Sequence, residues 1–161
     1  PTRPRAGGRQ GPGFGGCMIG EGREAGQPAV PAAFGTEALI EDFDTGPDGL
    51  LHLRVRGARR FHVERTRVRD NGLIVADVRW CAPDPTVELQ PQHALLGEVL
   101  ARIIEQIDTL DIAAPRQQRE DAAWAGWRLA ELLPLTLAQR QALLQEDDPD
   151  LRLDALVGLI D

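Results

Sequence analysis

The sequence predicts an α+β protein in which a β lobe is followed by an α-helical lobe. Between residues 36 and 80, apolar residues alternate with polar ones and glycine-containing turns separate the runs, which is typical of short antiparallel strands. Beyond Pro91 the apolar residues recur every three or four positions, as on amphipathic helices. The expected organisation is a flexible leader at 1–13, a β lobe at 14–90 and a helical lobe at 91–161.

Turn residues divide the β lobe into short strands. The expected turns are Gly46-Pro47-Asp48-Gly49, Gly57-Ala58 and Asp70-Asn71-Gly72, and residues 21–33 are expected to form a loop. The expected strands cover 14–19, 36–43, 51–56, 60–68 and 74–80. Leu51, Leu53 and Val55 alternate with polar residues, which predicts a half-buried strand. A phase slip near Glu64 and Arg65 predicts a bulge.

Capping signals place the helices after a proline-rich connector at 81–91. The apolar period predicts helices over 92–110 and 120–133, with a break at 111–118. Thr136 is expected to cap a third helix that ends near Leu144. Asp148 followed by Pro149 is a favoured start for a fourth helix.

The composition excludes several catalytic classes for this chain. All 18 basic residues are Arg, and the chain contains neither Lys nor Ser. A P-loop lysine, Schiff-base chemistry and a Ser-His-Asp triad are therefore excluded. We expect a protein that is not an enzyme and that has no cofactor.

The net charge of −7 is placed unevenly. Residues 1–90 carry 12 Arg against 12 acidic residues, whereas residues 91–161 carry 6 Arg against 13. An acidic total argues against broad binding to phosphate backbones. Cys17 and Cys81 lack zinc-site spacing and are expected to be buried thiols, although a disulfide is possible. No membrane span or signal peptide is visible, so the expected location is the cytoplasm.

One stretch of the β lobe is strongly basic. Residues 54–69 contain seven Arg and a single acid, giving a local charge of +6. Such a hairpin would grip RNA or an acidic partner, and its basic face would comprise Arg54, Arg56, Arg59, Arg65 and Arg67. The alternative is a solvated face whose guanidinium groups partly pair with the acidic helical half. Phe61 is the one aromatic residue in the run, which weakens a role in stacking bases.

Other polar groups give no site by themselves. With a turn at Gly57-Ala58, His52 would lie opposite Val63 and would not share a metal ion with His62, and exposed strand positions are expected for these two histidines. We therefore expect no metal site. The acidic runs 41–44 and 146–148 precede a turn and a helix, where carboxylates are favourable without any catalytic role. Trp124 and Trp127 are expected to pack in the core.

Two stretches of the chain together resemble the N-terminal substrate-binding domain of the Lon protease family. Residues 34–80 resemble that domain's strand, "DG" hairpin, "V-x-G-x-R-R-F" turn and closing strand after a second turn. Residues 129–160 are similar to its "LP(L)-x-x-x-x-x-(K/R)Q-x-LLE-x-x-D-x-x-x-RL-x-x-L" ending. The matching residues are Leu133-Pro134-Leu135, Arg140-Gln141, Leu143-Leu144, Asp147 or Asp148, and Arg152-Leu153.

The resemblance implies a PUA-like β pseudo-barrel joined to a helical bundle and used to recognise polypeptides. Before the strand at 14–19 the family has a strand pair and a helix, whereas this chain has a Gly- and Arg-rich leader. An incomplete barrel with an exposed edge is therefore expected. The leading hypothesis is a stand-alone, non-catalytic module for unfolded or tagged polypeptides or for a protein partner. It should present an exposed apolar patch, with the groove between the lobes as one place for it. The alternative hypothesis is an RNA-binding module that uses the basic hairpin.

Overall fold

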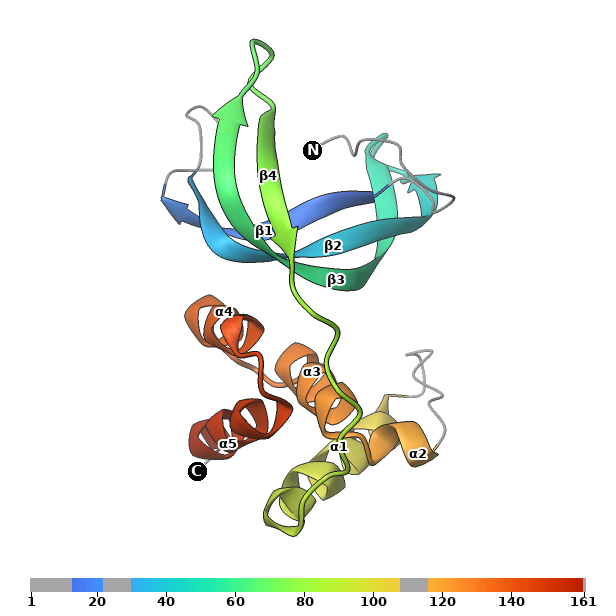
Figure 1. Ribbon diagram of the computed structural model, residues 1–161. Helices are drawn as coiled ribbons and strands as arrows, with labels where there is room; N and C mark the ends of the chain where they lie inside the picture. The colour runs from blue at the N-terminus through green and yellow to red at the C-terminus, as the bar shows by residue number, and fades with distance from the viewer. Residues whose placement is uncertain (1–12, 22–29, 108–115, 161) are drawn as a thin grey trace. The chain divides into compact units, whose positions relative to one another are not determined.

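The computed structural model describes residues 13–21, 30–107 and 116–160, which form two compact units (Figure 1). The first unit ends at Ala82 and the second begins at Pro83. This division lies eight residues before the start expected for the helical lobe, because part of the connector packs against helices. The first unit contains all the described strands and the second all the described helices.

The first unit is a four-stranded antiparallel sheet in the order β1-β2-β3-β4, so the chain is α+β as expected. The strands are β1 (Gly13–Glu21), β2 (Val30–Thr45), β3 (Leu51–Val68) and β4 (Ile74–Trp80). β3 is long and bends strongly (Figure 1). Its first part pairs with β2 and its last part with β4, so one strand serves both neighbours. β2 begins at Val30, within the segment expected to be a loop.

Two of the predicted turns are confirmed. Gly49 and Gly72 have positive φ angles of 76° and 79°, a conformation that glycine adopts without steric cost. Side chains complete both turns, since Asp48 Oδ1 accepts the Leu50 N–H at 3.0 Å and Asn71 Oδ1 accepts the Leu73 N–H at 3.1 Å. These residues define the β2–β3 and β3–β4 hairpins.

The predicted turn at Gly57-Ala58 is wrong. β3 continues through these residues with a register shift against β2 between Thr36 and Ala38, and Gly57 lies opposite Ala38. A two-residue hairpin turn needs positive φ angles, which Gly57 does not have. His52 consequently lies opposite Asp44, not opposite Val63. The bulge predicted near Glu64 is confirmed by a register shift between Val63 and Arg65.

Among the described residues of the first unit, Phe61 is the large side chain that is buried. A Cβ atom added at Gly35 would lie 2.6 Å from the Phe61 ring, 2.4 Å from Cys17 Sγ and 2.5 Å from the carbonyl oxygen of Gly16. The absence of a side chain at Gly35 therefore leaves room over β2 for the Phe61 ring of β3 and the Cys17 side chain of β1. The small core of this unit depends on one aromatic ring and on glycine.

The second unit is a helical bundle with its own core. Its elements are η1 (Pro91–His93), α1 (Ala94–Gln106), α2 (Arg116–Arg119), α3 (Ala122–Leu132), α4 (Leu137–Gln145) and α5 (Pro149–Ile160). α1, α3, α4 and α5 correspond to the four predicted helices, and the single turn α2 falls at the predicted break. The expected end of the first helix, at 108–110, lies outside the described residues. The buried core consists of Leu96, Leu100, Ala122, Ala125, Leu129, Ala130, Leu143, Leu153 and Leu156.

Capping groups fix where the helices begin. Thr136 and Gln139 form a capping box, with the Gln139 N–H donated to Thr136 Oγ1 at 3.2 Å and the Thr136 N–H to Gln139 Oε1 at 2.8 Å. Asp148 Oδ1 accepts the Asp150 N–H at 2.9 Å at the start of α5. Asp121 caps α3 and also accepts the Val87 N–H at 3.0 Å, which ties the connector to this helix.

A buried polar cluster connects three segments of the helical unit. The Arg152 guanidinium on α5 contacts both carboxylate oxygens of Asp84 at 3.3 Å and donates to the carbonyl of Glu146 at 2.7 Å. It stacks 3.5 Å above the Trp127 ring, whose Nε1–H donates to Asp84 at 2.6 Å. Arg152 is fully buried, so this cluster connects the connector, α3 and α5 from within the bundle.

Candidate functional site

The β2–β3 hairpin carries an exposed apolar face. Its cross-strand register places Phe43 opposite Leu53 and Ile40 opposite Val55. Residues that lie directly opposite each other share one face of a sheet, so these side chains gather on the same side of the hairpin. The exposed fractions are 70% for Phe43, 64% for Leu51, 45% for Leu53 and 43% for Val55. We call this set the hairpin apolar face.

The opposite side of the same hairpin is ionic. Asp42 lies opposite Arg54, with the carboxylate 3.2 Å from the guanidinium. Glu41 accepts a hydrogen bond from Arg56 at 2.8 Å. The alternation seen in the sequence is therefore a real two-faced strand pair. The prediction that Leu51, Leu53 and Val55 form a half-buried strand is nevertheless wrong, because all three are exposed, with exposed fractions between 43% and 64%.

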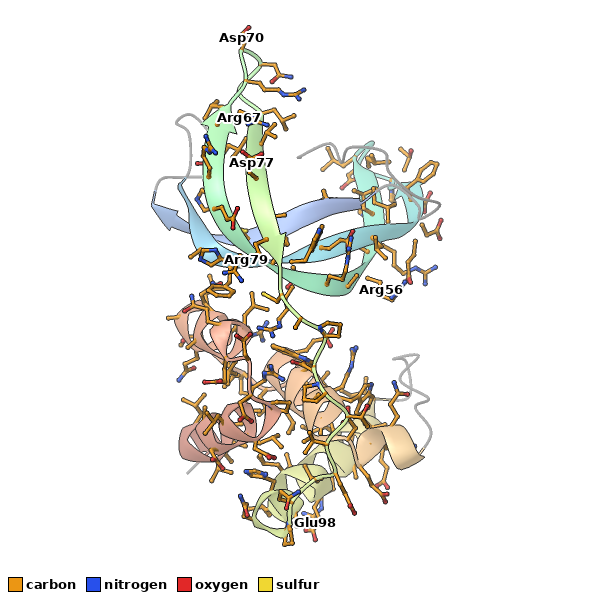
Figure 2. The ribbon with its side chains drawn as sticks, in the orientation of Figure 1. Arg56, Arg67, Asp70, Asp77, Arg79 and Glu98 are labelled. Atoms are coloured by element: carbon orange, nitrogen blue, oxygen red, sulfur yellow. The ribbon has the colours of Figure 1, made fainter. Side chains whose placement is uncertain are left out.

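The five residues of the predicted basic face all lie on β3, and each is paired with a carboxylate of a neighbouring strand. The pairs are Arg54–Asp42, Arg56–Glu41, Arg59–Glu37, Arg65–Asp77 and Arg67–Asp77, with distances between 2.8 and 3.7 Å. Figure 2 shows Arg67 and Asp77 side by side on β3 and β4. Their partners therefore come from the β lobe itself, not from the acidic helical half that the sequence analysis proposed. The local charge of +6 is largely neutralised across the sheet.

Arg59 holds the most elaborate of these pairs. Its guanidinium makes two hydrogen bonds to Glu37, at 2.9 and 3.2 Å, and stacks 3.7 Å from the centre of the Trp80 ring. These hydrogen bonds hold the pKa of Glu37 below its usual value and raise the pKa of Arg59. Both shifts favour the charged forms, so Glu37 and Arg59 remain an ion pair near neutral pH.

The remaining groups singled out from the sequence lie apart from one another. Among the described residues no three His, Cys, Asp or Glu side chains are placed to hold a metal ion. His52 is exposed and lies 3.3 Å from Asp48. His62, which was expected to be exposed, is half-buried. His93 is buried and its Nε2 lies 2.6 Å from Asp154, because the 3₁₀ turn η1 packs against α5.

The two cysteines are free thiols, and Trp124 and Trp127 pack within the helical unit. Cys17 and Cys81 are half-buried and do not form a disulfide, and burial raises the pKa of the Cys17 thiol. Trp124 packs against the helical core, and Trp127 belongs to the Arg152 cluster. The acidic run 146–148 provides the Asp148 cap of α5, as its position before a helix predicted.

The described residues therefore form two units, one of strands and one of helices. Exposed apolar side chains gather on the β2–β3 hairpin of the first unit. The family model for the "ATP-dependent protease La (LON) substrate-binding domain" matches residues 16–161. The chain belongs to this family of substrate-binding domains, as the resemblance in its sequence indicated.

The solved structures that are similar to the chain include two Lon N-terminal domains. The Lon N-terminal domain protein from Xanthomonas campestris has 53% sequence identity and a TM-score of 0.74, over 91% of this chain and 75% of that one. The N-terminal domain of Mycobacterium avium complex Lon protease has 20% identity and a TM-score of 0.56, over 80% and 70% of the two chains, and shows the fold alone. No match is found among curated proteins. None of the described helices is long and apolar enough to cross a membrane.

Proposed function

We propose that this chain is a polypeptide-binding module that captures apolar segments of unfolded or partly unfolded proteins on its hairpin apolar face, without cleaving them. The observation that carries the proposal is the exposure of this face on a hairpin whose other side is ion-paired. Exposed apolar patches on soluble proteins commonly mark interaction sites. The family's substrate-binding role supports a polypeptide ligand, because the substrates of a protease are polypeptides.

The geometry of the hairpin suits an extended apolar ligand. Leu51, Leu53 and Val55 project from alternate positions of one strand, about 7 Å apart, and Phe43 adds a ring opposite Leu53. An extended chain presents its own side chains with the same spacing. Binding would remove several partly exposed side chains from water at once, and each fully buried leucine contributes about 1.5–3 kcal/mol.

The experiment is fluorescence anisotropy with a labelled, reduced and carboxymethylated polypeptide and a labelled single-stranded RNA, each in a salt series. We expect polypeptide binding that persists as salt is raised, because apolar burial does not depend on counterion release. RNA binding that falls steeply with salt, without polypeptide binding, would contradict the proposal and support the basic hairpin instead.

Matched variants locate the contact. Leu51→Gln combined with Leu53→Gln should weaken polypeptide binding about a hundredfold, which is about a factor of ten for each leucine. A loss of about 1.4 kcal/mol of binding free energy corresponds to a factor of ten in affinity. Leu137→Gln on α4 is the control, because Leu137 is a leucine of similar exposure in the other unit. Equal affinity in the double variant and in the control would place the binding elsewhere.

A further inference from the structure

α5 has an exposed apolar side besides the side that packs against α3 (Figure 1). Leu151, Ala155 and Leu159 are spaced four residues apart, so they lie in line along one side of the helix, over about 12 Å. All three are exposed, with exposed fractions of 52% for Leu151 and 38% for Leu159. Arg152 and Leu156 belong to the buried side of the same helix. We call the three exposed residues the α5 stripe.

The middle of the α5 stripe is low enough for another helix to approach closely. Ala155 contributes only a methyl group, and Gly158, one turn further along, contributes no side chain. Gly158 is exposed, and a Cβ atom added there would meet open space among the described residues. Leu151 and Leu159 lie on either side of these small residues, so a large apolar side chain of a second helix would fit between the two leucines.

One border of the α5 stripe is acidic. Asp150 and Asp154 each come one position before a stripe residue, so both lie along the same edge of it. Their side chains are 39% and 55% exposed, so solvent reaches both, although both lie near His93. Arg152 is the one basic residue of α5, and it is buried in its own contacts with Asp84. The border therefore keeps its negative charge.

We infer that α5 docks a basic amphipathic helix of a partner protein. Such a helix would cover the α5 stripe with its apolar side and would bring Lys or Arg to Asp150 and Asp154 at the same time. A second copy of this chain fits less well, because residues 91–161 carry 6 Arg against 13 acidic residues and like charges would meet. The α5 stripe lies in the helical unit and the hairpin apolar face in the first unit, so the inference goes beyond the proposed function and does not depend on it.

The experiment measures fluorescence anisotropy with the full chain and three fluorescein-labelled peptides, each of about five helical turns. The first peptide has leucine every three or four residues with Lys beside the leucines. The second carries Glu in place of each Lys, and the third has the composition of the first in an order that forms no apolar stripe. The first peptide should bind at least about tenfold more tightly than either of the others, because only it has both the apolar stripe and the complementary charge.

Variants of the chain locate the contact. Gly158→Gln places a long side chain beside the α5 stripe and replaces glycine by a better helix former, so binding should weaken at least about tenfold without a lower Tm. Leu151→Gln combined with Leu159→Gln should weaken binding to a similar degree. Leu137→Gln on α4 is the matched control, because this leucine is 70% exposed in the same unit, and its affinity for the first peptide should be unchanged.

Contrary outcomes are distinguishable. Failure of the first peptide to bind, or equal affinity for the first and third peptides, would overturn the inference. Binding that Gly158→Gln leaves unchanged would also overturn it, and would assign the attraction to the net negative charge or to another surface. A concentration-dependent dimer in analytical ultracentrifugation that Gly158→Gln converts to a monomer would assign the stripe to a second copy. None of these results bears on the hairpin apolar face, which the carboxymethylated polypeptide and the Leu51 and Leu53 variants test separately.

Discussion

Arg152 is the position at which one substitution should most damage the helical unit. Replacing it by Met keeps much of the aliphatic volume but removes the guanidinium that contacts Asp84, Glu146 and the Trp127 ring. Asp84 is only 14% exposed, so its carboxylate would be left nearly buried without this partner. Removing one member of a buried ion pair typically costs about 3–5 kcal/mol.

The size of this effect follows from the size of the unit. For a domain of 60–100 residues, 1 kcal/mol corresponds to about 4–8 °C in Tm, so Arg152→Met should lower the Tm of the helical unit by at least about 12 °C. All described helices belong to this unit, so circular dichroism at 222 nm reports on it selectively. Arg128→Met is the control, because the Arg128–Glu131 pair lies at the surface and is worth about 0–1 kcal/mol.

A double variant tests the physical reason. Asp84→Asn with Arg152→Met removes both charges and leaves an amide oxygen that can accept the Trp127 Nε1–H. The double variant should therefore be more stable than the sum of the two single losses predicts, by about 1–3 kcal/mol. Additive losses, or a loss below about 1 kcal/mol for Arg152→Met in urea denaturation, would refute the view that an uncompensated buried charge sets the cost.

Three further predictions concern separate parts of the fold. Gly35→Ala should destabilise the sheet by about 1–3 kcal/mol, because the added Cβ would overlap the backbone carbonyl of Gly16. Gly57→Ala is the control and should be nearly neutral, because its Cβ has space; the two Tm values from thermal denaturation test the difference. Arg59 lowers the pKa of Glu37, so the Arg59–Glu37 pair stabilises the fold above pH 4.5, and this stabilisation is lost as the pH falls further. The free energy of unfolding, measured against pH, should therefore decrease less on acidification in Glu37→Gln than in the unmodified protein. Thr136→Ala should cost about 1 kcal/mol in urea denaturation, and an unchanged midpoint would show that the capping box is dispensable.

Features that depend on a few neighbouring residues could be predicted from the sequence. The glycine turns at Gly49 and Gly72 and the caps at Thr136 and Asp148 were all expected and are all present. Each is stabilised by contacts within a few residues, so its signal is complete in a short window. The predicted helices follow from the same local rules, together with an apolar period that matches their buried faces.

Features that depend on pairing across the sheet were harder to predict. Gly57 resembles a turn residue, but β3 continues through it because β2 pairs along the same strand. The basic run suggested a free cationic face because Glu37 and Asp77, which neutralise Arg59 and Arg67, lie 22 and 10 residues away in the chain. In retrospect, Arg152 shares a helix face with buried Leu156, four residues on, which was a usable signal for a buried arginine.

This neutralisation bears on the two functional hypotheses. Arg54, Arg56 and Arg59 each lie within 3.2 Å of a carboxylate of β2, with which a phosphate would have to compete. The hairpin apolar face carries no such ion pairs among the described residues. Under the proposed function, binding through that face should therefore be insensitive to salt, whereas binding of RNA to the basic face should weaken steeply as salt is raised.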